Sequence, residues 1–133
     1  MTAVLQSNIP GQLSVWLVGS SQVVYQRRRS VPDHGAEALL VILDELLRRR
    51  RLTVERLKRI AVVRGPGPFS AVRTGLVVAN TLSTVRQVPM TGVVVSQPLS
   101  RQMVRKIQSH PRRFRRQVVK PWYGREPNIS RPT

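Results

Sequence analysis

Two patterns of apolar residues alternate along the chain, and each predicts a different element. Short runs rich in Val, Leu and Ile indicate β-strands, whereas apolar residues repeating every three to four positions indicate helices that bury one face. Glycine and proline separate several of these segments and mark turns. We therefore expect strands at residues 3–5, 13–18, 22–26, 59–63 and 90–95, helices at about 33–51, 69–85 and 96–109, and a short helical turn at 53–57.

The order of these elements predicts an α/β domain. Three strands precede the first helix, and strand and helix then alternate, which is typical of helices packed on a mixed sheet. Asp33 is a suitable N-cap for the first helix, and three arginines at 27–29 are expected to extend the third strand into solvent. We expect residues 1–97 to form one domain. Residues 98–133 are expected to be a helix and then a basic tail, extended or partly disordered because it lacks an apolar period.

The first two long helices carry more apolar residues than one buried stripe requires. Leu40 and Leu47 widen the stripe of the first helix, and Val77 and Val78 widen that of the second. A helix on a sheet needs a single apolar stripe, so the surplus suggests a second buried face against another subunit. The alternative is that these four side chains only fill the core.

The charge of the chain is strongly positive and unevenly distributed. The formal net charge is +17, from 23 basic and 6 acidic residues, and an excess of this size favours polyanions such as nucleic acid. From residue 101 onward there are ten Lys or Arg and one Glu. The alternative is a solvated charge run that binds nothing specific. The candidate phosphate contacts are Arg112, Arg113, Arg115, Arg116 and Lys120, and the candidate stacking side chains are Phe114, Trp122 and Tyr123.

Residues for catalysis are sparse. The chain has no cysteine, which excludes disulfides, thiolate zinc sites and a cysteine nucleophile. His34 and His110 are its two histidines, and Asp44 and Glu45 are adjacent on a helix and so point in different directions. We therefore expect no metal site, no cofactor and no catalytic residue. With no secretory signal and no apolar run long enough for a membrane span, we expect a cytoplasmic protein without a membrane contact.

The most specific segment is the loop after the fourth predicted strand. It reads Arg-Gly-Pro-Gly-Pro from residue 64 and opens the second long helix. Gly65 and Gly67 permit close approaches that a Cβ forbids, and Pro66 fixes the path between them. Neither a Walker Lys-Ser/Thr pair nor the dinucleotide-binding spacing is present. A tight structural turn is favoured over a phosphate cradle at the helix start, although the free amides there keep the cradle open.

The stretch RGPGPFSAVRTGLVVANTL resembles the signature of the TsaB/YeaZ family, which reads approximately GPGSFTGLRIGL. His34, the Leu-rich helix before the loop and the later VPMTGVVVS strand also lie where that family has similar features. The resemblance covers roughly residues 3–96 and implies the N-terminal lobe only of the actin-like ATPase (ASKHA, RNase H-like) fold. The matching signature positions are Gly65, Pro66, Gly67, Phe69, Arg73, Gly75 and Leu76.

This chain departs from the family in three ways. The family's first strand leads into an Asp-Thr-Ser turn, whereas this chain has Ser7, Asn8 and Ile9 and no carboxylate there. Without that acid, a metal or nucleotide phosphate loses a natural ligand. Pro68, Ser70 and Ala71 replace the usual Ser, Thr and Gly of the signature. We also expect no second lobe, so any nucleotide cleft would be only half formed.

The resemblance implies a non-catalytic scaffold role in forming N6-threonylcarbamoyladenosine at position 37 of tRNA. In that family the first two long helices bundle with those of the transferase TsaD or of a second copy, and TsaE is a further partner. The expected partners are thus a TsaD-type transferase, TsaE, a second copy and tRNA through the basic tail. The alternative reading is a small basic nucleic-acid-binding protein that acts through its tail, and a degenerate copy with a meaningless tail is a third.

Overall fold

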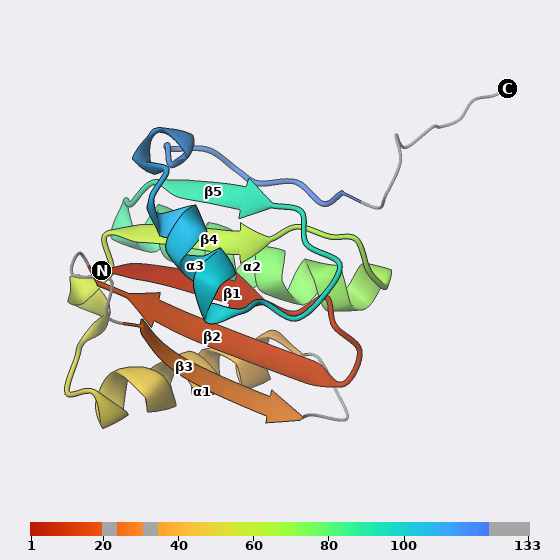
Figure 1. Ribbon diagram of the computed structural model, residues 1–133, viewed down its shortest axis with the longest axis horizontal. Coiled ribbons are helices and arrows are strands. Elements are labelled where there is room, and N and C mark those ends of the chain that lie inside the picture. Colours follow the sequence, from red (N-terminus) through yellow and green to blue (C-terminus); the bar gives the residue numbers. More distant parts are fainter. Residues whose placement is uncertain (20–23, 31–34, 123–133) are drawn as a thin grey trace, which may run out of the picture.

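The computed structural model describes residues 1–19, 24–30 and 35–122. A five-stranded sheet in the order β3-β2-β1-β4-β5 forms the centre of the molecule, with α1 and α2 on one face and α3 on the other (Figure 1). None of the described helices is both long and apolar enough to cross a membrane. The strands are β1 Thr2–Gln6, β2 Gln12–Val18, β3 Val24–Ser30, β4 Arg59–Val63 and β5 Met90–Val93; the helices are α1 Ala36–Arg49, α2 Phe69–Arg86 and α3 Arg101–Gln108, with short 3-10 turns at Val54–Arg56 and Pro111–Arg113.

The pairing of the strands makes the sheet mixed. β1, β2 and β3 pair antiparallel in sequence order, whereas β4 pairs parallel with β1 and β5 pairs parallel with β4. Parallel neighbours need a crossover connection, and helices α1 and α2 lie within the two crossovers. The prediction of an α/β layer with helices on a mixed sheet is confirmed.

The core divides into two layers because successive residues of a strand face opposite sides of the sheet. Leu5 of β1 faces α1 and α2, whereas its neighbour Val4 faces α3. The larger layer also contains Leu17, Ile42, Leu46, Ile60 and Leu76, and the smaller layer contains Trp16, Ala61, Val63, Leu99, Val104 and Phe114.

Two predicted helix starts are wrong. Helix α1 begins at Ala36, with Gly35 at the N-cap, and the predicted cap Asp33 lies outside the described residues together with His34 and residues 22–23. Helix α3 begins at Arg101 because the hydroxyl of Ser100 caps it, accepting a hydrogen bond from the Met103 amide at 3.2 Å. The three arginines of β3 do extend that strand as predicted.

Residues 110–122, the described part of the predicted tail, contain one 3-10 turn and otherwise no helix or strand, but they are packed against the sheet. This segment follows the β5 edge of the sheet, where Arg115 forms a bridge with Met90. Its apolar anchors, Phe114 and Val119, are buried, and the Val119 amide donates to the side chain of Asn80 at 3.0 Å. Two isolated anchors have no period, so pattern analysis misses them. Leu99 and Val104 also join the core, so the structure continues across the predicted boundary at residue 97.

Candidate functional site

The glycine–proline loop joins β4 to α2 and lies against the segment that ends at Trp122. The Trp122 amide donates to the carbonyl of Arg64 at 2.8 Å, and the Gly65–Pro66 peptide is cis. Gly65 has a φ of +138°, and a Cβ on it would lie 1.7 Å from the Trp122 carbonyl oxygen. Glycine is therefore required at this position both by its dihedral angle and by the close approach of another backbone.

The other two glycines of the motif let α2 approach the end of β1. A Cβ on Gly67 would lie 2.8 Å from the carbonyl oxygen of Asn8. A Cβ on Gly75, two turns into the helix, would lie 2.7 Å from the Ser7 hydroxyl oxygen. The spacing of the motif thus reflects a close contact between loop, helix and strand.

Ser7 and Asn8 connect three segments at the carboxyl end of β1. The Ser7 hydroxyl donates to the Ala71 carbonyl at 2.6 Å and accepts from the Gly75 amide at 2.9 Å. The Asn8 side-chain amide donates to the carbonyl oxygens of Pro66 at 2.8 Å and Val95 at 2.7 Å. Both residues are buried. The Ser7 hydroxyl and the Asn8 amide are thus hydrogen-bonded to other parts of the protein. This network supports the interpretation of the loop as a structural turn over that of a phosphate cradle.

The four residues predicted to form a partner interface separate into two pairs. Leu40 and Val77 are 44% and 48% exposed, as an interface residue must be. Leu47 and Val78 are only 5% and 2% exposed and belong to the core, so their prediction as surface residues is wrong. Helix α2 packs on the sheet and also against α1, so it buries a wider arc than one stripe.

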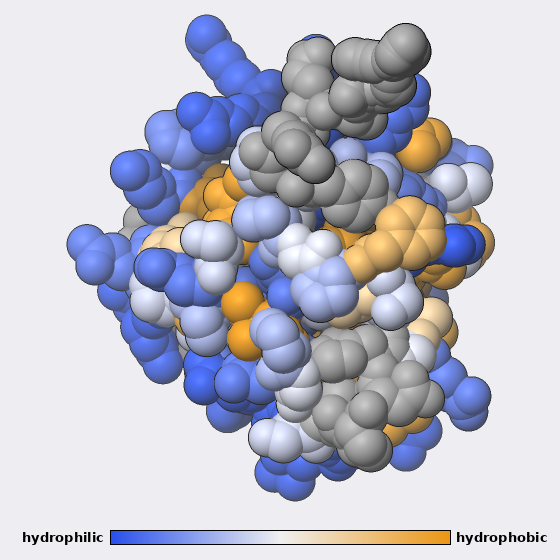
Figure 2. Space-filling view, turned by 90° about the vertical axis from the view of Figure 1, so that its right-hand side faces the viewer, coloured by the Kyte–Doolittle hydropathy of each residue, from blue (hydrophilic) through white to orange (hydrophobic). Residues whose placement is uncertain are grey.

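Phe69 is a third exposed apolar side chain on these two helices. Its side chain is 59% exposed, and the Arg73 guanidinium lies over its ring at 5.4 Å from the centroid. Phe69, Arg73 and Val77 follow one another at helical spacing and, with Ala36 of α1, line a hollow of about 250 Å³. We call Leu40, Phe69 and Val77 the α1–α2 face. Figure 2 views the molecule from the end at which α2 begins and shows apolar side chains interspersed with hydrophilic ones.

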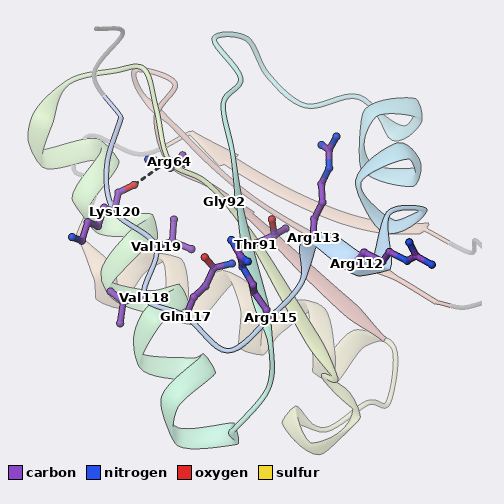
Figure 3. Close-up of a pocket in the computed structure, with 10 residues that line it drawn as sticks. All are labelled: Arg64, Thr91, Gly92, Arg112, Arg113, Arg115, Gln117, Val118, Val119 and Lys120. Carbon is purple, nitrogen blue, oxygen red and sulfur yellow. Dashed lines mark hydrogen bonds between the residues drawn. The ribbon is translucent and has the colours of Figure 1, made fainter. Parts of the chain in front are cut away.

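Four of the five predicted phosphate-contacting residues line one groove, together with an arginine that the sequence analysis did not select. The groove lies between β5 and the segment that follows α3 and has a volume of about 510 Å³ (Figure 3). Arg116 is not among its lining residues, and its guanidinium donates to the Gln87 carbonyl at 3.4 Å. We call this feature the basic groove; its cations are Arg64, Arg112, Arg113, Arg115 and Lys120.

Arg64 enters the basic groove from β4 through a contact that the sequence does not reveal. Its Nε donates to the Lys120 carbonyl at 2.9 Å. In the sequence, Arg64 is recognisable as a basic residue directly after a buried strand. The sequence does not show that residues 115–122 lie beside it. Chain positions 64 and 120 meet only because residues 115–122 return along the sheet edge.

The predicted stacking side chains are not all accessible. Phe114 is 8% exposed, and the Arg59 guanidinium lies 4.7 Å from its ring centroid, so its prediction as a base-stacking residue is wrong. Trp122 is partly buried, and Tyr123 lies outside the described residues. In a polar segment, an aromatic side chain tends to be buried because the burial of its large apolar surface stabilises the folded protein more than any other contact of that segment.

Within the described part of the chain, no group of three or more His, Cys, Asp or Glu is placed to hold a metal ion. The two adjacent carboxylates of α1 have different partners, as their direction on a helix predicts. Asp44 pairs with Arg48 at 3.0 Å, and Glu45 pairs with Arg27 and Arg29 of β3, each at 3.0 Å.

A comparison with known protein families identifies the family of this chain. The family model described as TsaD, tRNA N6-adenosine threonylcarbamoyltransferase, matches residues 29–103, more than half of the chain. The chain belongs to the TsaD family. The match includes the glycine–proline loop and the α1–α2 face, whereas residues 112–120 of the basic groove lie beyond it.

Individual TsaD-family relatives match over shorter stretches. The tRNA N6-adenosine threonylcarbamoyltransferase of Syntrophotalea carbinolica is 37% identical over 57 residues, which is 43% of this chain and 17% of that protein. The enzyme of the same name from Listeria monocytogenes is 33% identical over 60 residues, 45% of this chain and again 17% of that protein. The chain thus spans a small part of the curated relatives it matches.

The solved structures with a similar fold include YeaZ from Pseudomonas aeruginosa. It superimposes with a TM-score of 0.65 and 26% identity, covering 70% of this chain and 43% of YeaZ. A second structure, of an uncharacterised protein similar to peptidase YeaZ from the same organism, has the same TM-score and identity and is covered to 42%. The predicted fold, one lobe of the actin-like ATPase type, is confirmed.

Proposed function

We propose that this chain is a TsaB-like, non-catalytic scaffold in tRNA N6-threonylcarbamoyladenosine formation and that it docks on a TsaD-type transferase through its α1–α2 face. The observation that carries the proposal is this face itself. Leu40, Phe69 and Val77 are each between 44% and 59% exposed although they lie on two adjacent, well-packed helices. Large apolar side chains gathered on neighbouring elements are typical of protein interaction sites.

The surroundings of the α1–α2 face suit a protein partner. Arg73 lies between Phe69 and Val77 and covers part of the Phe69 ring, so an apolar centre is combined with a cation that can pair with a partner's carboxylate. Aromatic and arginine side chains are the residues that most often dominate binding energy at interfaces. The hollow of about 250 Å³ beside them offers space for one inserted side chain.

The choice of scaffold over transferase rests on the chemistry of the site. The carboxyl end of β1 carries Asn8, whose amide is engaged with two carbonyl groups, and not a carboxylate able to bind a cation. Asp44 and Glu45 are both held in ion pairs. The likeness to YeaZ and the family match support a place in this pathway. We further propose that a TsaE-type ATPase and a second copy of the chain are additional partners and that the protein is cytoplasmic.

The double variant Leu40→Glu with Val77→Glu tests the docking. Two carboxylates in the centre of an apolar interface must be desolvated, so we expect binding to the TsaD-type transferase of the same cell to weaken by at least about 100-fold. Both side chains are already half exposed, so the melting temperature is expected to stay within a few degrees of the wild type. Affinity is measured by calorimetry with purified proteins, and stability by thermal unfolding.

The matched control is Val85→Glu with Val94→Glu, two apolar residues that are 72% and 48% exposed; Val85 lies in the last turn of α2, at the opposite end of the helix from Phe69. It adds the same charge and is expected to retain wild-type affinity. Equal affinity of the Leu40/Val77 variant and the wild type for the transferase contradicts the proposal. Loss of a homodimer with unchanged transferase binding assigns the face to a second copy and likewise contradicts it.

A further inference from the structure

The acidic residues of the described chain lie away from the basic groove. The described acidic residues are Glu37, Asp44 and Glu45 of α1 and Glu55 of the turn after it, and α1 packs against β2 and β3. The basic groove lies beside β5, the strand at the other edge. Among the described residues, no carboxylate is within ion-pair distance of a groove cation. The positive potential of the groove is therefore not neutralised from within this part of the chain.

The cations of the basic groove are spread along it and do not converge on one point. Figure 3 shows Arg112 and Arg113 extending from the end near α3, Arg115 lying beside Gln117 in the middle, and Arg64 and Lys120 at the opposite end. A site for one small phosphate needs donors that meet at one point. A row of separate cations instead suits a ligand with regularly spaced negative charges, which is the chemistry of a nucleic-acid backbone.

The fold holds the two walls of the groove together. The Gln117 side-chain amide donates to the Met90 carbonyl at 2.8 Å, and Arg115 pairs with Met90 through both backbone groups at 2.9 and 3.1 Å. Val119 is anchored by Asn80 of α2, and Arg64 Nε bonds to the Lys120 carbonyl. The cations thus project from a backbone fixed against β5, which lowers the entropy lost on binding.

We propose that the basic groove binds the phosphate backbone of nucleic acid, independently of base sequence and of the docking function of the α1–α2 face. Arg64, Arg113, Arg115 and Lys120 contact successive phosphates along the groove, and Arg112 extends the row. None of the described residues that line the groove is aromatic, and the ring of Phe114 is buried against Arg59. Affinity therefore depends on charge and falls steeply with salt.

The test compares two triple variants of the full chain in binding a fluorescent RNA hairpin across a salt series. The groove variant is Arg113→Gln, Arg115→Gln and Lys120→Gln. The control removes the same charge from exposed residues elsewhere: Arg28→Gln, Arg101→Gln and Lys58→Gln. We expect the groove variant to bind about tenfold or more weakly and its log–log salt slope to fall by about 2–3, since each of the three lost phosphate contacts removes about 0.7–0.9 unit. The control is expected to keep the wild-type slope.

Three outcomes overturn the proposal. Equal losses in the two variants show that net charge alone drives binding. Displacement of the RNA by inorganic phosphate at the same phosphate concentration shows a site for a small anion. A groove variant that loses binding to phosphatidylserine vesicles but keeps RNA binding assigns the groove to a membrane surface. Thermal unfolding confirms that both variants are folded, and the transferase affinity of the groove variant, expected to be unchanged, separates this test from that of the α1–α2 face.

Discussion

Asn8→Asp is expected to lower the free energy of unfolding by about 3–5 kcal/mol at neutral pH, the range for a buried charge that its surroundings compensate poorly. The Asn8 amide donates to the carbonyl oxygens of Pro66 and Val95, and the residue is 2% exposed. A carboxylate in its place has no hydrogen to donate and faces two oxygen atoms at about the same distance. The loop before α2 and the chain after β5 then lose their common connection to β1. Chemical denaturation measures the change.

The loss caused by Asn8→Asp is expected to depend on pH. Burial and the two carbonyl dipoles raise the pKa of the new carboxyl in the folded state above its unfolded value. Between the unfolded and folded pKa the native state then binds more protons than the unfolded state, so stability falls as pH rises through this window. Relative to the wild type, the variant is therefore expected to be most stable in acid, below the unfolded pKa, and least stable above the folded pKa.

Asn8→Ala is the control for this experiment. It removes the same amide donors without adding a titratable group, so its loss of stability relative to the wild type is expected not to vary with pH. A difference between Asn8→Asp and Asn8→Ala that is constant from pH 4 to 8 contradicts the prediction. It would mean that the carboxyl of Asn8→Asp reaches water in the folded state and keeps its unfolded pKa.

Gly65→Ala is expected to cost about 2–4 kcal/mol and to detach the segment that ends at Trp122. The new Cβ would lie 1.7 Å from the Trp122 carbonyl oxygen, a backbone atom that can move away only with its segment. The hydrogen bonds from the Trp122 amide to Arg64 and from Arg64 Nε to Lys120 are then broken. The φ of +138° adds backbone strain for any residue with a Cβ. Thermal unfolding and amide exchange at Trp122 measure the two effects.

Gly11→Ala is the matched control for the glycine substitution. Gly11 also has a positive φ, of +74°, but a Cβ there would meet no atom within 4 Å. Its substitution is expected to cost only about 1 kcal/mol, the strain of the left-handed conformation, and to leave exchange at Trp122 unchanged. Equal costs at the two positions show that the dihedral angle alone matters and contradict the close contact with Trp122.

Hydrophobic periodicity determined the elements and the fold class of this protein. The strands follow from short apolar runs, and the two long helices from apolar residues spaced by three to four positions, because the apolar surface that an element must bury is set by its local sequence. The glycines of the loop were recognisable as a motif because a close approach of two backbones excludes a Cβ atom, whichever segment is the neighbour. The family resemblance also depended on this loop and on its position between a strand and a helix.

Contacts between distant segments were decided only by the tertiary structure. Leu47 and Val78 looked like surplus apolar residues, but α2 packs on the sheet and on α1 at once, so both are core residues. Phe114 and Val119 carry no period, yet they fasten a basic segment to the β5 edge and bring Lys120 to Arg64. A pattern along the chain records which side chains avoid water. Which segment covers them depends on long-range packing, and the basic groove and the α1–α2 face are both products of that packing.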